Sequence, residues 1–399
     1  MSEVAQAPHS SPDGHIPQLR FPEFNVSWNE YKLGSITDVV DSLHTTPKDY
    51  VSSGFPMIRV VDVNNIELDL NKCLNVSEET YRQFTKKYQP KVGDVVLSRV
   101  GTCGASIMLR TKDNVCLGQN TVLLHPKINK DFYHILVKSN IFQVQVSRRV
   151  VGSTQKTLSL KDLKLFKLNI PAKPEQQKIA EFLTAVDNKI EQLSKKQALL
   201  GEYKKGLMQQ IFSQAIRFKA DDGSEFPDWE EKKFDDIFNI SAGGDINKSN
   251  TNPIQNEKYK YPVYANSGKN KGLYSYSDIY KQDEDCVTVT GRGALGLAVA
   301  RYDKFYPIVR LLVLRGKQEL NIKFFEEAIN LVRIYNESTG VPQLTAPQFK
   351  SYKTSYPCLP EQTKIANFLS SIDSRIEQVG KQLDESKQFK KALLQQMFV

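Results

Sequence analysis

Two stretches of the chain repeat apolar residues at a spacing of seven. The first stretch has them at Ile179, Val186, Leu193, Leu200 and Leu207, with Leu183, Ile190 and Ile211 on the adjoining seam. The second has them at Ile365, Ile372, Val379 and Leu393, with Leu369, Ile376, Leu383 and Met397. Such spacing over several turns is typical of coiled-coil packing. The pattern predicts two long helices that pack on each other, each seam carrying polar breaks at Gln197, Lys204, Ser386 and Lys390.

The start of each predicted helix carries the same sequence. PEQQKIAEFL at residues 174–183 returns as PEQTKIANFL at residues 360–369. Proline suits the first helical turn, where its missing N–H is harmless, and the following glutamate favours the positive helix end. A repeat of this length indicates two structural halves in one chain.

Each predicted helix is preceded by a region of mixed character. Both regions open at a tryptophan, Trp28 or Trp229, and both contain a β-branched run that ends in a glycine turn, at 94–104 and 285–296. β-Branched runs flanked by glycine indicate strands and turns. Both regions close with a capping-box pattern that starts a short helix, at 159–162 and 345–348. The frames of the two regions match, whereas their contents differ.

These patterns predict an α+β protein. We expect two mixed α/β domains separated by two long antiparallel coiled-coil helices, with a pseudo-two-fold internal repeat. The expected boundaries are a flexible tail at 1–19, domains at 20–170 and 217–357, and helices at 171–216 and 358–399. A helix of about 40 residues spans roughly 60 Å, so such a pair could act as a ruler between two sites on duplex DNA.

Composition narrows the class of partner. The net charge of +9 favours a polyanion, although a solvated basic surface explains the charge equally well. Five scattered cysteines indicate reduced thiols rather than disulfides or a zinc site. Without an apolar run of about 18 residues or a secretory signal, we expect a cytoplasmic protein that does not contact a membrane.

The sequence contains no familiar catalytic motif. The chain lacks a phosphate loop, an amino-methyltransferase motif, a zinc-protease motif and a serine-hydrolase motif. Pro227-Asp228 followed by Glu230 faintly resembles a nuclease motif, but these acids are too close together for paired strands. We therefore expect a protein that is not an enzyme and binds no metal.

Candidate DNA contacts lie in and around the glycine turns. Arg99 and Arg292 could each read a guanine edge, a contact that gives roughly 1–3 kcal/mol of discrimination, although a surface ion pair is the plain alternative. Arg148 and Arg149 are phosphate clamps or a solvated helix face. The predicted contacts in the first domain are Arg59, Arg99, Gly101, Thr102, Gln119, Asn120, Arg148, Arg149, Ser153, Thr154, Gln155 and Lys156. Those in the second are Tyr264, Asn266, Ser267, Lys269, Lys271, Arg292 and Gln343. Tyr264 could equally be strand core, and Gln119 and Asn120 could be buried loop anchors.

Together, the two Pro-Glu-Gln helix starts, the stretch from Gly152 to Leu163 and the two strand–glycine turns resemble the specificity subunit of a type I restriction–modification system. The resemblance implies two target-recognition domains that each read one half of a bipartite double-stranded DNA target. It also implies spacer helices that dock two methyltransferase subunits, in a complex with two restriction subunits. S-adenosylmethionine, ATP and Mg would bind those partners and not this chain. The helix positions expected to serve spacing and docking are Ile179, Leu183, Val186, Ile190, Leu193, Ile365, Leu369, Ile372, Ile376 and Val379.

Other classes of function stay open at this point. A self-contained nuclease or methyltransferase would need a catalytic motif. A coiled-coil scaffold, such as a phage decoy that occupies methyltransferase subunits, would lose nothing when Arg99 and Arg292 are replaced. A single-component regulator would bind a specific sequence without any partner.

Overall fold

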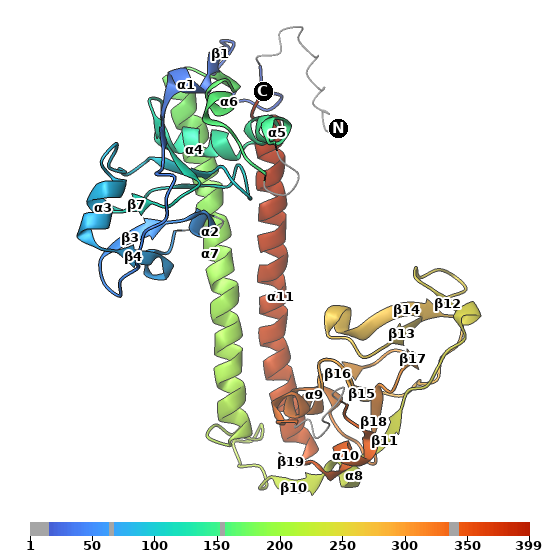
Figure 1. The fold of residues 1–399 in the computed structure, drawn as a ribbon. Helices are drawn as coiled ribbons and strands as arrows, with labels where there is room; N and C mark the ends of the chain where they lie inside the picture. The colour runs from blue at the N-terminus through green and yellow to red at the C-terminus, as the bar shows by residue number, and fades with distance from the viewer. Residues whose placement is uncertain (1–15, 64–67, 152–155, 335–342) are drawn as a thin grey trace. The chain divides into compact units, whose positions relative to one another are not determined.

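The computed structural model describes residues 16–63, 68–151, 156–334 and 343–399. The chain divides into two compact units. The first unit comprises Met1–Lys195 together with Gly380–Val399, and the second comprises Lys196–Val379. Each unit thus contains one mixed α/β domain and a part of both long helices (Figure 1).

Three small sheets form the strand framework of the first unit. The largest is antiparallel, in the order β2 (Thr37–Asp41), β8 (Thr121–Pro126), β5 (Val95–Ser98) and β6 (Ser106–Met108). In the second sheet, β3 (Phe55–Ile58) pairs antiparallel with β4 (Leu74–Val76) and parallel with β7 (Cys116–Leu117). β1 (Asn29–Lys32) pairs antiparallel with β9 (Lys167–Ile170) and so joins the two ends of the domain.

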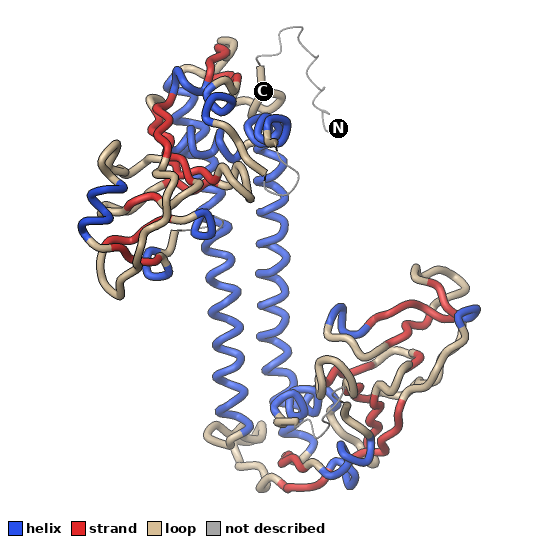
Figure 2. The backbone as a smooth tube through the Cα atoms, in the orientation of Figure 1, coloured by secondary structure: helices blue, strands red, loops and turns tan. Residues whose placement is uncertain are grey.

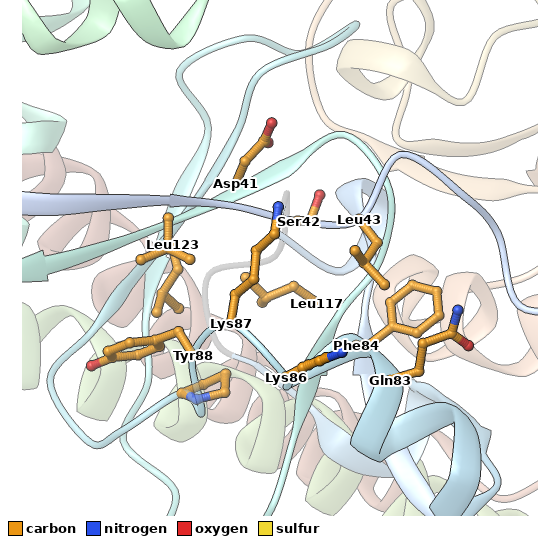
Figure 3. Close-up of a pocket in the computed structure, with 12 residues that line it drawn as sticks. Asp41, Ser42, Leu43, Gln83, Phe84, Lys86, Lys87, Tyr88, Leu117 and Leu123 are labelled. Carbon is orange, nitrogen blue, oxygen red and sulfur yellow. The ribbon is translucent and has the colours of Figure 1, made fainter.

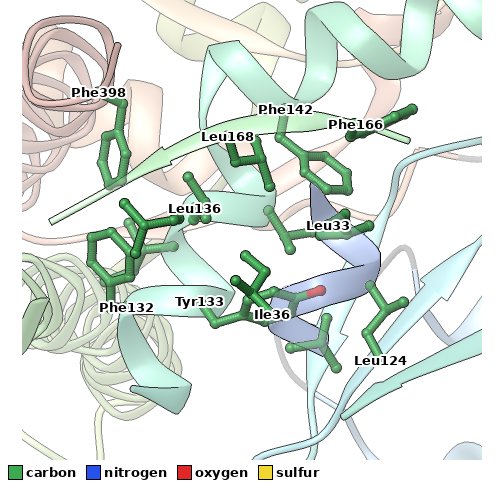
Figure 4. Close-up of a cluster of buried hydrophobic side chains, with 14 of the residues drawn as sticks. Leu33, Ile36, Leu124, Phe132, Tyr133, Leu136, Phe142, Phe166, Leu168 and Phe398 are labelled. Carbon is green, nitrogen blue, oxygen red and sulfur yellow. The ribbon is translucent and has the colours of Figure 1, made fainter. Parts of the chain in front are cut away.

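Short helices pack against these sheets, and most of them contribute to the main core of the first unit. They are α1 (Leu33–Ile36), α2 (Val60–Val63), α3 (Glu78–Phe84), α4 (Lys130–Lys138), α5 (Asn140–Arg149) and α6 (Leu160–Lys164), with a 3₁₀ turn η1 (Leu70–Lys72). Figure 4 shows Phe132, Tyr133 and Leu136 of α4 among Leu33 and Ile36 of α1 and Phe398 from the end of the chain. The last residues of the chain are therefore part of the core of the first unit.

The second unit repeats this plan. Its largest sheet runs β11 (Phe238–Ala242), β18 (Leu312–Gly316), β15 (Cys286–Val289) and β16 (Ala298–Arg301). A second sheet runs β12 (Thr251–Asn252), β14 (Leu273–Ser277), β13 (Tyr261–Tyr264) and β17 (Tyr306–Pro307), and β10 (Glu230–Lys233) pairs with β19 (Lys353–Tyr356). The helices are α8 (Phe234–Ile237), α9 (Ile322–Leu331) and α10 (Ala346–Ser351), with 3₁₀ turns η2 (Lys248–Asn250) and η3 (Lys269–Gly272). Figure 2 separates these short helices from the strands by colour.

The two long helices predicted from the heptad spacing are confirmed as α7 (Lys173–Phe212) and α11 (Leu359–Gln396). Within the first unit they run antiparallel. Asp187 of α7 pairs with Lys390 of α11, whereas Val399, beyond the end of α11, accepts a hydrogen bond from Asn169, before the start of α7. The α+β class with two mixed domains, long helices and an internal repeat is confirmed.

The polar breaks in the seams have partners. Lys390 lies 2.5 Å from Asp187 in the first unit, and Lys204 lies 2.8 Å from Asp373 in the second. The repeat thus supplies the same pair twice, each time with the aspartate from one long helix and the lysine from the other. Polar pairs at such positions favour one register of a helix pair over its neighbours.

The predicted spacer positions are covered by the chain itself. The buried ones are Ile179, Leu183, Leu193, Ile365, Leu369, Ile372 and Val379, and the half-buried ones are Val186, Ile190 and Ile376. These side chains serve the packing of the long helices inside each unit. Their predicted part in docking stays a prediction, and a partner would meet the outward faces of the helices rather than these side chains.

Candidate nucleic-acid interface

A buried glutamate fixes the mixed domain to the long helix in the first unit. Glu175, only 2% exposed, accepts two hydrogen bonds from the Arg20 guanidinium at 2.7 Å and a third from Trp28 Nε1 at 3.2 Å. Arg20 also donates to the Val26 carbonyl. A carboxylate and a guanidinium can share a buried site because each satisfies the other with two parallel hydrogen bonds.

The second unit repeats the cluster. Glu361 accepts two hydrogen bonds from Arg217 at 2.9 Å and a third from Trp229 Nε1 at 3.2 Å. Arg217 in turn donates to the carbonyls of Phe226 and Pro227. The positive end of the helix dipole adds to the preference for a carboxylate at this place.

The glutamine beside each glutamate orients the domain. Gln176 accepts from the Asn129 N–H, at the cap of α4, and donates to the Pro171 carbonyl. Gln362 accepts from the Asn321 N–H, at the cap of α9, and donates to the Pro357 carbonyl. The repeated Pro-Glu-Gln sequence is therefore an anchor between helix and domain.

Sequence reasoning missed Arg20 and Arg217, the cationic partners of these anchors. A signal was present, because an Arg-Phe pair occurs at 20–21 and again at 217–218. The two phenylalanines also take equivalent places: Phe21 packs edge-on against Phe182, and Phe218 packs against Phe368.

The glycine turn of the first unit brings together five of the contacts predicted there: Arg99, Gly101, Thr102, Asn120 and Lys156. The Arg99 N–H donates to the Asn120 carbonyl, and the Gly101 N–H donates to the Lys156 carbonyl. Gly101, Thr102 and Lys156 are exposed. One surface thus combines backbone turns with a lysine and an arginine.

Arg99 does not project freely from this surface. Its Nε lies 3.3 Å from Asp41 Oδ1 on β2, as an ion pair without hydrogen-bond geometry, and its side chain is 12% exposed. Its terminal nitrogen lies 3.3 Å from His44 Nδ1, and His44 also contacts Asp41. The positive charge of Arg99 is therefore largely neutralised, whereas Lys156 at the same turn stays exposed.

Gln119 and Asn120 lie in the turn before β8. Asn120 has a left-handed backbone (φ +69°), which asparagine tolerates better than most residues. Arg59 lies behind this turn, since its side chain packs on Gly118 and pairs with Asp62 at 3.1 Å. Arg59 is thus held against the body of the domain.

The two arginines at the end of α5 differ in direction. Arg148 is exposed, whereas the Arg149 guanidinium lies over the Phe166 ring at 5.1 Å and bonds Gln145. Arg148 is thus better placed for a phosphate than Arg149. Ser153, Thr154 and Gln155 lie outside the described residues.

A small cavity of about 180 Å³ opens beside Asp41 (Figure 3). Its lining is mainly apolar, from Leu43, Phe84 and Tyr88, with Lys86 and Lys87 at its edge. The adjacent lysines were not among the predicted contacts, although a Lys-Lys pair is visible in the sequence.

In the second unit the glycine turn brings together Asn266, Arg292 and Gln343. Asn266 accepts a hydrogen bond from the Gly291 N–H and donates to the Val309 carbonyl. Arg292 pairs through its backbone with Gln343, and its guanidinium lies 3.5 Å from the Gln343 side-chain oxygen. These three predicted residues form one cluster.

The register of this turn differs by one residue from that of the first unit. The Leu158 N–H donates to the Arg99 carbonyl, and the equivalent Leu344 N–H donates to the Gly291 carbonyl. Gly291 therefore occupies the place of Arg99, and Arg292 occupies the place of Val100. The second arginine thus lies one residue further along its turn than Arg99 does.

A strained turn adjoins this cluster. Val309 and Arg310, between β17 and β18, both have left-handed backbones, with φ of +48° and +60°. For a β-branched residue this is a strong outlier, and such conformations cost about 1–3 kcal/mol each. Hydrogen bonds from both N–H groups to the Gly244 and Gly243 carbonyls hold the turn. Arg310 was not among the predicted contacts.

The remaining predicted residues of the second unit fall into two groups. Tyr264 lies under the Arg301 guanidinium at 3.5 Å and packs edge-on against Phe305, so its ring belongs to the core. Burial lowers the pKa of Arg301. Lys269 and Lys271 are exposed in η3, and Ser267 accepts the Lys269 N–H.

Among the described residues, no group of three or more His, Cys, Asp or Glu side chains is arranged to hold a metal ion. Within the same residues, no helix is both long and apolar enough to cross a bilayer.

Solved structures with the same fold include a type I restriction–modification S subunit from M. genitalium. It superimposes with a TM-score of 0.64 over 96% of this chain and 99% of its own, at 16% identity. A second, from work on assembly and conformational transition of the type I R-M system, gives a TM-score of 0.57 over 92% of this chain and 96% of its own, at 13% identity.

Sequence relatives have the same family name. A candidate type I restriction enzyme specificity subunit, MjaX of Methanocaldococcus jannaschii, is 25% identical over 96% of this chain and 93% of its own. A candidate type I specificity subunit of Mycoplasma pneumoniae is 27% identical over 86% of this chain and 88% of its own. The family model of the type I restriction modification DNA specificity domain matches twice, at residues 25–200 and 227–385. The chain therefore belongs to the type I restriction–modification DNA specificity family, with two specificity domains.

Proposed function

We propose that each of the two domains reads one half of a bipartite duplex DNA target. The long helices set the gap between the halves and dock two methyltransferase subunits, to which two restriction subunits can be added. The chain itself is non-catalytic and binds neither S-adenosylmethionine nor ATP, Mg or another metal.

The duplicated anchor is the observation that carries this proposal. Glu175 and Glu361 hold their domains on the helices through the same Arg–Trp cluster. The turns that these anchors support differ in charge and in register, at Arg99 and Arg292. Two identical methyltransferase partners require similar helix–domain anchors. Two different half-sites require turns that differ.

The basic balance of the chain agrees with a DNA partner. The net charge is +9, and neutralisation of phosphates by Lys and Arg supplies much of the affinity of such proteins. Exposed basic side chains lie near both turns, at Lys156 and Arg148 in the first unit and at Lys269 and Lys271 in the second.

The proposal is tested by methylation sequencing of a methylation-free host that expresses this chain with its neighbouring methyltransferase gene. We expect one new bipartite methylated motif that disappears when this chain is omitted. A stable complex of the two proteins without any new motif contradicts the proposal and favours a scaffold or decoy.

Two further measurements test the finer claims. Calorimetric titration of the purified chain with S-adenosylmethionine should show no binding, and stoichiometric tight binding would contradict a non-catalytic role. Sequence-specific binding by the isolated chain, with no methyltransferase present, would instead favour a single-component regulator.

A further inference from the structure

We infer that Arg310 acts together with Arg292 as a two-guanidinium clamp that reads guanine in the half-site of the second domain. The inference rests on the proposed function, to which it adds one contact residue, Arg310, and the base that it recognises, guanine. The two guanidiniums share one acceptor: Arg310 Nη1 lies 3.2 Å and Arg292 Nη2 lies 3.5 Å from Gln343 Oε1.

The charges of this pair are not neutralised. Within the described part of the chain, neither Arg292 nor Arg310 has a carboxylate within ion-pair distance, and Arg292 Nε is buried without a hydrogen-bond partner. A neutral amide is a weak acceptor for two cations held side by side. The pair therefore favours an added ligand with acceptor atoms.

Arg292 lines an open cavity of about 580 Å³, and Arg310 directly follows Val309, which is also part of the lining. Its lining includes Asp245, Lys248, Asn266, Tyr274, Arg292 and Val309. One acid among three cations, Arg310 included, leaves the region positive. An open, positively charged cavity suits an acceptor-rich base edge or a phosphate.

The backbone is built to present Arg310. Left-handed residues at 309 and 310 turn the chain sharply before β18, and Arg310 is exposed. Asn266 holds both sides of the arrangement, since it bonds the Gly291 N–H next to Arg292 and the Val309 carbonyl next to Arg310. A strained turn that neighbouring groups hold so closely is typical of a binding site.

Guanine matches this chemistry better than the other bases. Its major-groove edge offers two acceptors, O6 and N7, and a guanidinium donates to both. Adenine offers an acceptor beside a donor and would repel one arm of the fork. Gln343, whose oxygen is occupied by the arginines, keeps its amide N–H groups for a further acceptor.

The test uses the full chain in complex with its methyltransferase. Arg310→Ala, Arg310→Lys and Arg292→Ala are expressed in a methylation-free host, and the methylated motif of each is compared with that of the parent. We expect both alanine variants to relax guanine positions in the same half of the motif, by roughly 5- to 150-fold in discrimination, and the other half to stay unchanged. Arg310→Lys should keep only part of the discrimination for guanine, because lysine cannot donate two parallel hydrogen bonds as a guanidinium does.

A second measurement identifies the atoms. Duplexes with 7-deazaguanine at those positions lack the N7 acceptor, so the parent complex should bind them more weakly than guanine duplexes. The Arg310→Ala complex, which keeps only Arg292, should show a smaller difference between the two duplexes. Arg315→Ala is the matched control, because Arg315 lies on β18 and pairs with Glu284. Pull-down of the methyltransferase and the melting temperature of each complex report on folding.

The outcomes separate the clamp from the proposed function. If the parent yields a bipartite motif and Arg310→Ala leaves that motif unchanged, the clamp is rejected and the function stands. Uniformly weaker methylation without relaxed bases also rejects it, since Arg310 would then contact phosphate. A parent that yields no motif removes the proposed function and the clamp with it.

Discussion

The two units hold their domains alike and present different charges at the turns. The buried carboxylates of Glu175 and Glu361 each accept three hydrogen bonds, two from an arginine and one from a tryptophan. At the glycine turns, Arg99 is paired with a carboxylate, whereas Arg292 and Arg310 share a neutral amide. The two halves of the repeat thus share the buried anchor between helix and domain and differ in the charges of their glycine turns.

The largest expected effect comes from breaking an anchor. Glu175→Ala leaves Arg20 buried without its partner, and loss of one member of a buried ion pair costs about 3–5 kcal/mol. Glu361→Ala should do the same to the second unit, because Arg217 and Trp229 lose the same three hydrogen bonds.

Hydrogen exchange of the full chain measures which unit loosens in each anchor variant. Glu181→Gln is the control, since this glutamate is exposed on α7 and bonds only Gln177 among the contacts described. Equal loosening of both units by either variant would contradict separate anchoring.

A smaller effect separates the lysines of the two seams. Lys204 bonds Glu327 and Asp373, and Glu327 is only 6% exposed. Lys204→Met should therefore lower the free energy of unfolding by about 1–2 kcal/mol, because the buried Glu327 loses one of its two lysine partners and keeps only Lys323. Lys390→Met removes a single, more exposed pair with Asp187 and should cost no more than about 1 kcal/mol.

Urea unfolding of the two methionine variants measures this difference. The exchanged pair Asp187→Lys with Lys390→Asp serves as the control, because it restores the attraction with the signs reversed. A larger loss from Lys390→Met than from Lys204→Met would overturn the comparison.

Acid should weaken the first unit at α4. Burial, assisted by the positive charges of Lys138, Arg110 and Lys390, lowers the pKa of His134 to about 3. As the pH falls, His134 takes up a proton near pH 6.5 in the unfolded chain but only near pH 3 in the folded chain. The contribution of neutral His134 to the free energy of unfolding is therefore fully present above pH 6.5 and is lost as the pH falls towards 3. By pH 5 the loss is about 1–2 kcal/mol.

Protection factors of α4 and α9 between pH 7 and pH 5 check the acid effect. At the same distance from its cap, α9 has Glu326 in place of His134. His134→Gln should remove the extra pH dependence of α4, and an unchanged slope in that variant would assign it to other groups.

The smallest effect should come from removing the charge that neutralises Arg99. Asp41→Asn makes the first turn resemble the second, so the salt dependence of DNA binding by the complex should steepen by about one unit of slope. Asp38→Asn, on the same strand but paired with the exposed Lys127, should leave the slope unchanged. Equal slopes for both variants would show that Asp41 does not tune this contact.

The helices and the strand–turn frames could be predicted because their signals are local. Seven-residue spacing at Ile179 and Ile365 needs only neighbouring turns, and the predicted caps at Ser159 and Thr345 are confirmed, each accepting an N–H three residues on. The partners of the glutamates could not be predicted, because Arg20 and Glu175 are far apart in sequence and meet only when β1 pairs with β9. Asp41 reaches Arg99 through the order of β2, β8 and β5, which no short pattern contains.

The interrupted first unit has a consequence for synthesis. Leu393, Met397 and Phe398 belong to its core, although 184 residues of the second unit, 196–379, are made before them. During translation, the first unit therefore cannot complete its core until the last residues are made. The second unit, by contrast, can fold while translation continues. The same order means that replacement of residues 196–379 would leave both ends of the first unit's core in one chain.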